Sequence, residues 1–290
     1  MMTEEKPMPL HSKRGRRETV LKFIFVFAGA CIMLYPLAWM LSSSLKPEVL
    51  IFRELGLIPT EFTFDNYIYG WSSMPGINFT LFFKNTLLLV LFCIIGNVAS
   101  CSMTAYAFAR LELIGKNIFF GVLLGTMMLP FHVVLLPRFI IFTKLGWVNT
   151  YLPLIVPTFL AANGFFCFML VQFMRSIPRE LDQAATIDGC GPVQIYYRII
   201  MPLCRSAMAL VMVLTLIWTW NDFFSQLIYI GNPKLFTVAL GLRTFIDATG
   251  ASNYGQLFAM STVSLVPIIL FFVFAQKQLM GGIAIQGLKG

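Results

Sequence analysis

Long apolar segments alternate with short polar ones along most of this 290-residue chain. A helix that crosses the hydrocarbon core of a bilayer needs about 20 predominantly apolar residues. Six segments have this length, so the sequence predicts an all-α, polytopic membrane protein with six transmembrane helices. They cover residues 23–45, 81–109, 118–136, 152–174, 207–230 and 257–279.

The first apolar segment follows a basic cluster at residues 13–17, as the apolar core of a secretory signal peptide would. A signal peptide has a shorter apolar core, of roughly 7–15 residues, and a small-x-small cleavage site behind it. This segment is longer and no such site follows it. We therefore expect 23–45 to be a retained transmembrane helix.

The distribution of Lys and Arg predicts the orientation of the chain. With the N-terminus inside, the inner connections carry fourteen of the 21 Lys and Arg residues. The excess of basic residues on cytoplasmic loops then places both termini in the cytoplasm. The chain divides into a cytoplasmic N-terminal segment (1–22), a six-helix transmembrane domain (23–280) and a cytoplasmic C-terminal tail (281–290).

Composition supports the membrane assignment and excludes other classes. Only 12% of the residues are charged, whereas soluble domains have about 25%. The net charge of +8 is explained by the basic inner loops, and we expect no nucleic acid partner because no recognition motif is present. The six cysteines form no C-x-x-C pair and the two histidines are isolated, so we expect neither a disulfide framework nor a metal site.

The inner loop 175–206 differs from the other connections, because its sequence predicts two short helices separated by glycine. Pro178 suits the first turn of a helix. Glu180 and Asp182 follow in that turn, where negative charge complements the helix dipole. Gly189 stands where a left-handed residue would end this helix, and a second helix then leads back to the membrane.

The first of these helices has small residues on one face. Leu181, Ala184, Ala185 and Asp188 share that face by their spacing. A small face lets another backbone approach closely. The face therefore suits either docking into a partner or packing against the protein's own bundle, and both interpretations remain open.

The same loop resembles the "EAA" loop of permeases in ATP-binding-cassette importers. That family's pattern is Glu-Ala-Ala, three residues, Gly, nine residues, then Ile-x-Leu-Pro. The matching residues here are Gln183-Ala184-Ala185, Gly189 and Ile199-Ile200-Met201-Pro202. Every spacing fits, but Met201 replaces the leucine and Gln183 replaces the glutamate. Methionine keeps the apolar volume, whereas Gln183 lacks the charge for any ion pair that the family glutamate makes.

Further segments resemble the MalG-type permeases of carbohydrate importers. They are Met128-Leu129-Pro130, residues 146–151, Trp220-Asn221-Asp222 and residues 287–290. The resemblance implies the type I importer permease fold, in the bacterial inner membrane. It also implies transport of sugars, such as maltodextrins, raffinose-type sugars or uronate oligomers of the alginate type.

The resemblance implies several partners as well. They are a MalF-type second permease, two copies of an ATPase, and a periplasmic or extracellular solute-binding protein. The first helix of the inner loop would be a coupling helix that docks on the ATPase, and we call residues 175–206 the coupling loop. The implied coupling residues are Glu180, Asp182, Gln183, Ala184, Ala185, Asp188, Gly189, Ile199 and Pro202. The outer loop 231–256 would reach into the binding protein, and the tail 281–290 would lie against the ATPase pair.

The chain carries no G-x-x-x-x-G-K-[ST] phosphate loop. It also has no nucleophile–base constellation of the kind that an intramembrane hydrolase needs. We therefore expect no enzymatic activity and no cofactor in this chain, with ATP and Mg²⁺ bound by partner subunits.

Asp222 is the one carboxylate well inside a predicted span, next to Trp220 and Asn221. A charge at the centre of a bilayer costs about 2.5–3.5 kcal/mol on insertion scales and usually faces a pathway or a partner. These three residues are therefore candidates for lining a translocation pathway. The alternative, which we favour on these residues alone, is an interfacial belt of tryptophans with Asp222 near the outer headgroups.

Asn85, Asn97 and Asn163 are further polar residues in predicted spans. Hydrogen bonding between helices is the commoner role of such residues. Lining of a pathway is the alternative, and Asn85 and Asn163 are the candidates for it. Gly121 and Gly125 have the spacing that permits close packing between helices.

An ion-coupled secondary transporter is the alternative function. Such a protein would place ion-coupling carboxylates near the midplane, often with inverted repeats and broken helices. Only Asp222 qualifies as such a carboxylate, and the sequence shows no repeat. Uptake that survives ATP depletion but collapses with the ion gradient would favour this alternative.

Overall fold

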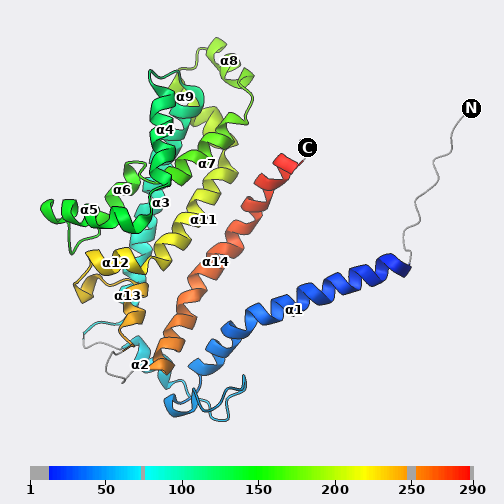
Figure 1. The fold of residues 1–290 in the computed structure, drawn as a ribbon, viewed down its shortest axis with the longest axis vertical. Coiled ribbons are helices and arrows are strands. Elements are labelled where there is room, and N and C mark those ends of the chain that lie inside the picture. Colours follow the sequence, from blue (N-terminus) through cyan, green and yellow to red (C-terminus); the bar gives the residue numbers. More distant parts are fainter. Residues whose placement is uncertain (1–12, 73–75, 247–252, 288–290) are drawn as a thin grey trace, which may run out of the picture.

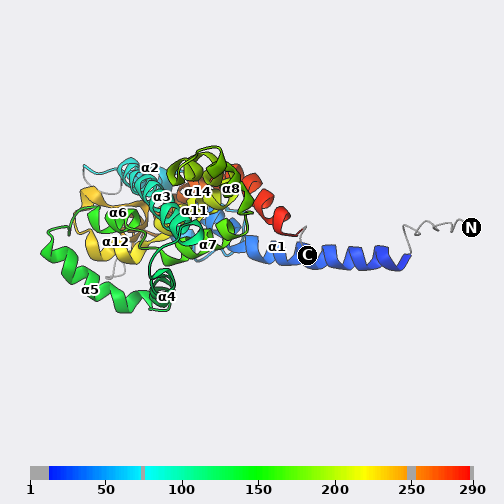
Figure 2. The ribbon, with the colours of Figure 1, turned by 90° about the horizontal axis from the view of Figure 1, so that it is seen from above.

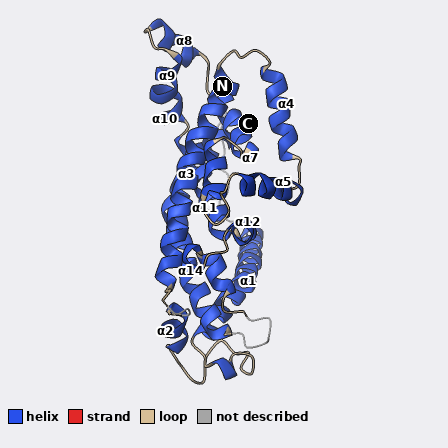
Figure 3. Ribbon diagram, turned by 90° about the vertical axis from the view of Figure 1, so that its left-hand side faces the viewer, coloured by secondary structure: helices blue, strands red, loops and turns tan. Residues whose placement is uncertain are grey.

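The computed structural model describes the backbone of residues 13–72, 76–246 and 253–287, and the side chains of 19–72, 76–246 and 253–276. Within these ranges the chain is helical without any strand, which confirms the all-α prediction (Figure 3). The helices form an elongated bundle around α3 (Phe79–Arg110), which runs along most of its length (Figure 1).

The remaining elements surround α3 or project from it. The longer helices are α1 (Lys13–Ser44), α4 (Lys116–Met127), α5 (Phe131–Lys144), α6 (Leu152–Phe159), α7 (Gly164–Arg175), α8 (Glu180–Ile187), α11 (Arg205–Asn221) and α14 (Tyr254–Gly287). The shorter elements are η1 (Glu48–Leu50), α2 (Asp65–Trp71), α9 (Pro192–Ile195), the π-helix η2 (Tyr196–Ile200), α10 (Met201–Leu203), α12 (Phe223–Tyr229), η3 (Pro233–Leu235) and α13 (Val238–Arg243).

Four helical stretches of the described chain are long and apolar enough to cross a membrane. They are Thr19–Ser44, Phe79–Arg110, Leu152–Arg175 and Tyr254–Gln276. Two bent pairs raise the number to six if each pair is one span, namely α4 with α5 at 102° and Pro192–Leu203 with α11 at 76°. The six predicted spans agree with this upper number.

Three of the predicted spans are interrupted rather than continuous. The span predicted at 118–136 breaks between α4 and α5 at residues 128–130. Pro130 explains this break, because proline has no amide hydrogen and disfavours helical geometry in the residue before it. The span predicted at 152–174 breaks at 160–163, and the one predicted at 207–230 breaks at Asp222.

A polar side chain caps the new helix at each of the last two breaks. The carboxylate of Asp222 accepts a hydrogen bond from the amide of Ser225 at 3.0 Å. The side-chain oxygen of Asn163 accepts one from the amide of Phe166 at 3.3 Å. Asn and Asp are strongly preferred at this position because they satisfy an amide that the helix leaves free. Both residues therefore start helices in the middle of apolar stretches.

Helix α3 packs against α6, α7 and α11. Gly96 brings α3 and α6 together, since an added Cβ there would collide with Thr158 Oγ1 and lie 2.8 Å from the ring of Phe159. Gly121 and Gly125 of α4 behave differently from the sequence-based expectation. Added Cβ atoms at these two positions meet no described atom within 4 Å, so they make no close helix contact within the described chain.

Helix α1 diverges from the bundle (Figures 1 and 2). It meets α14 near its own C-terminal end, where the rings of Trp39 and Phe258 are 5.4 Å apart. The apolar window of Thr19–Ser44 is 0% buried within the chain. This helix must therefore be covered by lipid or by another subunit.

The connection after α1 is held to the rest of the chain by buried polar contacts. Lys46 is fully buried, and its ammonium donates to the carbonyls of Glu54 and Gly56 at 2.6 and 2.7 Å. The carboxylate of Glu48 accepts from the first two amides of α14 at 2.9 and 2.7 Å. Hydrogen bonds from the side chain and amide of Thr60 lower the pKa of Glu54. This connection is a fixed part of the fold.

Candidate functional site

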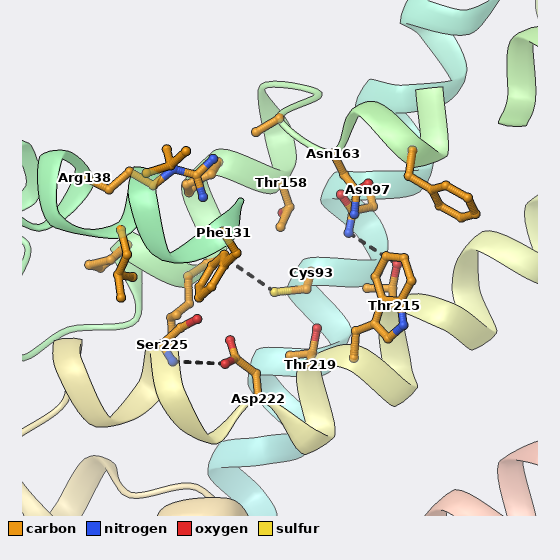
Figure 4. Close-up of a pocket in the computed structure, with 18 of the residues that line it drawn as sticks. Cys93, Asn97, Phe131, Arg138, Thr158, Asn163, Thr215, Thr219, Asp222 and Ser225 are labelled. Atoms are coloured by element: carbon orange, nitrogen blue, oxygen red, sulfur yellow. Dashed lines mark hydrogen bonds between the residues drawn. The ribbon is translucent and has the colours of Figure 1, made fainter. Parts of the chain in front are cut away.

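A cavity of about 860 Å³ lies beside α3, bounded by α5, α6, α7, α11 and α12 (Figure 4). Its wall is largely apolar and aromatic, with amides, hydroxyls and two charged side chains placed among these groups. Arg138 approaches the cavity from α5, and Asp222 lies at the start of α12. Pockets that bind small molecules commonly combine an apolar wall with a few orienting polar groups.

All three helix breaks meet at this cavity. Phe131, Asn163 and Asp222, which adjoin the three breaks, all line it. Inside a bilayer, irregular backbone is tolerated only where it is buried in protein or lines a water-filled cavity. The breaks therefore mark a polar region within the apolar part of the chain.

Three of the five candidate pathway residues line the cavity. They are Asn163, Asn221 and Asp222. The amide group of Asn221 also donates to the carbonyl of Ile217 at 2.8 Å. These contacts give the polar side chains fixed positions in the wall.

The other two candidates, Asn85 and Trp220, do not line this cavity. The amide group of Asn85 donates to the carbonyls of Lys234 and Phe236 at 3.0 and 2.9 Å, and so ties α3 to the connection after α12. Trp220 is 4% exposed and contacts Phe83, with ring centroids 6.1 Å apart. Both residues hold helices and loops together.

Sequence reasoning missed several residues of the cavity wall. Leu89, Cys93 and Asn97 form a stripe on α3 with a spacing of four, which could have indicated a shared face. Asn97 also makes the contact between helices that was predicted for it, because its amide group donates to the hydroxyl of Thr215 on α11 at 3.2 Å. Trp218 lines the cavity and stacks on Phe166 at 5.0 Å. No local pattern in the sequence distinguishes Trp218 from Trp220.

The coupling loop lies at the opposite end of the bundle from α2 (Figures 1 and 3). Helix α8 covers Glu180–Ile187, and Gly189 follows in the left-handed region with φ of +81°. Helix α9 then starts at Pro192, where the amide of Gly191 donates to the side chain of Gln194 at 3.0 Å. The predicted order of helix, glycine and helix is present.

The two faces of α8 have different surroundings. Ala185 is 5% exposed against the chain's own bundle, and Asp182 forms an ion pair with Arg110 at 3.0 Å. The other face is free, with Ile187 87% exposed. Of the predicted small face, Ala185 packs on the bundle while Leu181, Ala184 and Asp188 are exposed, and docking of this helix into a partner stays a prediction. The remaining exposed residues of the predicted set are Glu180, Gln183, Ala184, Asp188, Gly189 and Pro202, and Ile199 is half-buried.

Two known proteins are similar in sequence to this chain over most of its length. The "Arabinooligosaccharides transport system permease protein AraQ" of Halalkalibacterium halodurans is 33% identical over 264 residues, covering 90% of this chain and 93% of that protein. The "Trehalose/maltose transport system permease protein MalG" of Thermococcus litoralis is 30% identical over 278 residues, covering 94% and 99%.

A solved structure shares the fold. It is a chain from the crystal structure of a bacterial ABC transporter involved in the import of the acidic polysaccharide alginate. The TM-score is 0.80 at 20% sequence identity, and the match covers 93% of this chain and 99% of that one. This agreement confirms the prediction of an importer permease fold.

The model of one protein family, described as "Binding-protein-dependent transport system inner membrane component", matches residues 96–280. The matched region contains the three helix breaks and the coupling loop. The chain therefore belongs to the family of binding-protein-dependent transport system inner membrane components.

Proposed function

We propose that this chain is one permease subunit of an ATP-driven sugar importer, and that the cavity beside α3 is its share of the translocation pathway. The observation that carries this proposal is the presence, in one chain, of a cavity walled by three helix breaks and, at one end of the bundle, a loop with an exposed helix face. As a membrane component of a transport system, the chain is not an enzyme.

The chemistry of the cavity wall supports a sugar as the substrate. A sugar ring is apolar on its faces and carries hydroxyls at its edge. Trp218 offers a flat apolar surface, while Asn163 and Thr219 offer hydrogen-bonding groups in the same cavity. The two relatives compared above are named for arabinooligosaccharide and for trehalose and maltose transport, which agrees with this class of substrate.

A second permease of the MalF type would complete the pathway. No residue of α4 is buried within the chain, and Leu135 is the buried residue of α5. These two helices carry many exposed apolar side chains, including Val122 and Leu136, and the exposed Leu129 between them lines the cavity. A second subunit packed there would cover this surface and close the cavity.

ATP and Mg²⁺ would act on two ATPase subunits at the cytoplasmic side, where the free face of α8 would dock. Closure of the ATPase pair would move α8, and the movement would change the access of the cavity from one side of the membrane to the other. Such coupling requires that the ATPase state and the cavity share one two-state element. A solute-binding protein would deliver sugar at the other end, where part of the implied docking loop, residues 247–252, lies outside the described chain.

The test is uptake by the complete complex in lipid vesicles. The complex would contain this chain, its second permease, two ATPases and the binding protein, with arabinooligosaccharides, maltodextrins and uronate oligomers as labelled probes. We expect sugar uptake only when ATP is supplied on the side of the vesicle membrane where the ATPases lie. Replacing the phosphate-loop lysine of the ATPase should abolish this uptake.

The same vesicles distinguish the alternative function. An imposed proton or sodium gradient without ATP should give no uptake. Gradient-driven uptake without ATP would contradict the proposal and support an ion-coupled secondary transporter. Uptake of none of the three sugar classes, with ATPase activity intact, would contradict the assignment of sugar as substrate.

A further inference from the structure

The C-terminal end of α3 carries a buried arginine that contacts three separate parts of the chain. The side chain of Arg110 is 3% exposed, and one nitrogen forms the 3.0 Å ion pair with Asp182 of α8. Its other terminal nitrogen donates to the carbonyls of Met174 and Ile177, at 2.6 and 2.8 Å. One guanidinium thus joins α3, the end of α7 and the coupling helix.

These contacts suit arginine in particular. A guanidinium presents several donors in a fixed plane, whereas a lysine ammonium is a compact charge that cannot match that plane. The carbonyls of Met174 and Ile177 are main-chain groups at the point where the chain leaves α7 for the coupling loop. Arg110 therefore holds both the start of the loop and the helix that follows.

Two further side chains on the same face of α3 reach later parts of the loop. The hydroxyl of Tyr106 donates to the carbonyl of Pro192 at the start of α9, at 2.9 Å. The hydroxyls of Ser102 and Tyr196 are 2.7 Å apart, which joins α3 to the π-helix η2. Positions 102, 106 and 110 follow one another at intervals of four and so lie along one stripe of the helix.

The helix that holds the loop also forms the wall of the cavity. Cys93 and Asn97 of α3 line the cavity, about one to three turns before Ser102, where the stripe begins. Near the start of the same helix, Asn85 holds the connection after α12. Since α3 is one unbroken helix from Phe79 to Arg110, a displacement of its cytoplasmic end is carried along it to the cavity.

We propose that Ser102, Tyr106 and Arg110 are positioning residues that fasten the coupling loop to α3, with the Arg110–Asp182 ion pair as the principal contact. Through this attachment, movement of α8 becomes movement of the cavity wall. The inference rests on the proposed function, because it assigns the route by which an ATPase would act on the pathway.

The ion pair is sensitive to loss of either partner. The Nε atom of Arg110 and one carboxylate oxygen of Asp182 are already buried without a hydrogen-bond partner in the described chain. Removing one residue of a buried pair leaves an unpaired charge, which costs more than removing both. The losses caused by Arg110→Gln and by Asp182→Asn, added together, should therefore exceed the loss in the double variant.

The experiment compares these variants in the complete importer complex. We expect Arg110→Gln and Asp182→Asn to keep their ATPase subunits on purification, yet to transport about tenfold less sugar per ATP hydrolysed. Stimulation of ATP hydrolysis by sugar-loaded binding protein should fall in parallel. The double variant should be no worse than the more affected single variant. Tyr106→Phe, which removes only the hydroxyl, should give a smaller loss of the same kind.

Glu112→Gln is the matched control, because Glu112 is an exposed charge two residues after Arg110 and lies outside the coupling loop. It should transport as the unsubstituted complex does. Normal transport per ATP in both Arg110→Gln and Asp182→Asn would overturn the inference. It would also be overturned if these variants lost their bound ATPase and kept normal transport per ATP hydrolysed. If Arg110→Gln fails to accumulate, the nearly isosteric Asp182→Asn decides the question alone.

The controls also separate this inference from the proposed function. If the unsubstituted complex and Glu112→Gln show no ATP-dependent sugar uptake, the proposed function fails. If both transport sugar and the two ion-pair variants transport equally well, only the role of the α3 stripe fails.

Discussion

Gly189 and Gly191 stand two residues apart in the coupling loop but have different backbones. Gly189 has φ of +81°, whereas Gly191 has an ordinary φ of −77°. An added Cβ meets no atom within 4 Å at either position. Any difference between alanine substitutions at the two sites therefore comes from backbone strain and not from packing.

We expect Gly189→Ala to reduce transport per ATP severalfold, because a left-handed backbone costs a residue with a side chain about 1–2 kcal/mol. Gly191→Ala should have no effect. Uptake and ATP hydrolysis measured together in vesicles would check this. Equal behaviour of the two variants would show that the left-handed joint is not needed for coupling.

Asp222 caps α12 and also lines the cavity. Substitution can separate the effect of its negative charge from the effect of its helix cap. Asparagine is as good a helix cap as aspartate, whereas alanine costs about 1 kcal/mol. We expect Asp222→Asn to retain most ATP-dependent uptake and Asp222→Ala to lose much more. A collapse of uptake in Asp222→Asn, with normal protein levels, would show that the carboxylate charge itself is required.

At the residue scale, the sequence shows which polar residues lie in apolar stretches but not what each of them does. Asn85, Asn163 and Asp222 all look like isolated polar groups in apolar stretches. Asn85 holds a loop, while Asn163 and Asp222 cap helices at the cavity. The difference depends on the local backbone and on contacts with residues as far as 151 positions away. No local pattern carries that information.

At the scale of elements, the contact of α3 with α6 depends on the absence of a side chain at Gly96. We expect Gly96→Ala to lower the melting temperature in detergent, since overpacking of this kind costs about 1–3 kcal/mol. Gly121→Ala is the control, because open space surrounds that position in the described chain. A melting temperature unchanged in both variants would show that α6 can move away without cost.

The sequence predicted the helices of this fold well and their interruptions poorly. Hydropathy over a window of about 20 residues finds a span even when the helix changes direction within it. The break at Pro130 has a recognisable cause in the chemistry of proline. The breaks at Asn163 and Asp222 do not, because capping residues resemble any polar residue that faces a neighbouring helix. The helix–glycine–helix order of the coupling loop was predictable because capping and turn preferences act locally.

For the whole molecule, the orientation in the membrane gives a direct prediction. Ile58 lies in the connection after α1 and is 83% exposed, and Ile114 lies between α3 and α4 and is 101% exposed. With both termini in the cytoplasm, Ile58→Cys should react with an impermeant maleimide added to spheroplasts. Ile114→Cys should react only in inside-out vesicles.

The unsubstituted chain, with its six cysteines, provides the background for both labelling reactions. Labelling of Ile114→Cys from outside, with Ile58→Cys protected, would reverse the orientation assigned from the basic residues. The coupling loop would then face away from the ATP-containing compartment.

The three helix breaks have a consequence for how such a protein changes its substrate in evolution. Helix ends leave backbone groups without partners in their own helix, and these groups are the same whatever the side chains are. Where such groups reach the cavity, they would offer hydrogen bonds to many different sugars without selecting one. A pathway must release its cargo as readily as it accepts it. A permease built in this way can be inherited by importers of different sugars, while the choice of cargo evolves in the protein that delivers it.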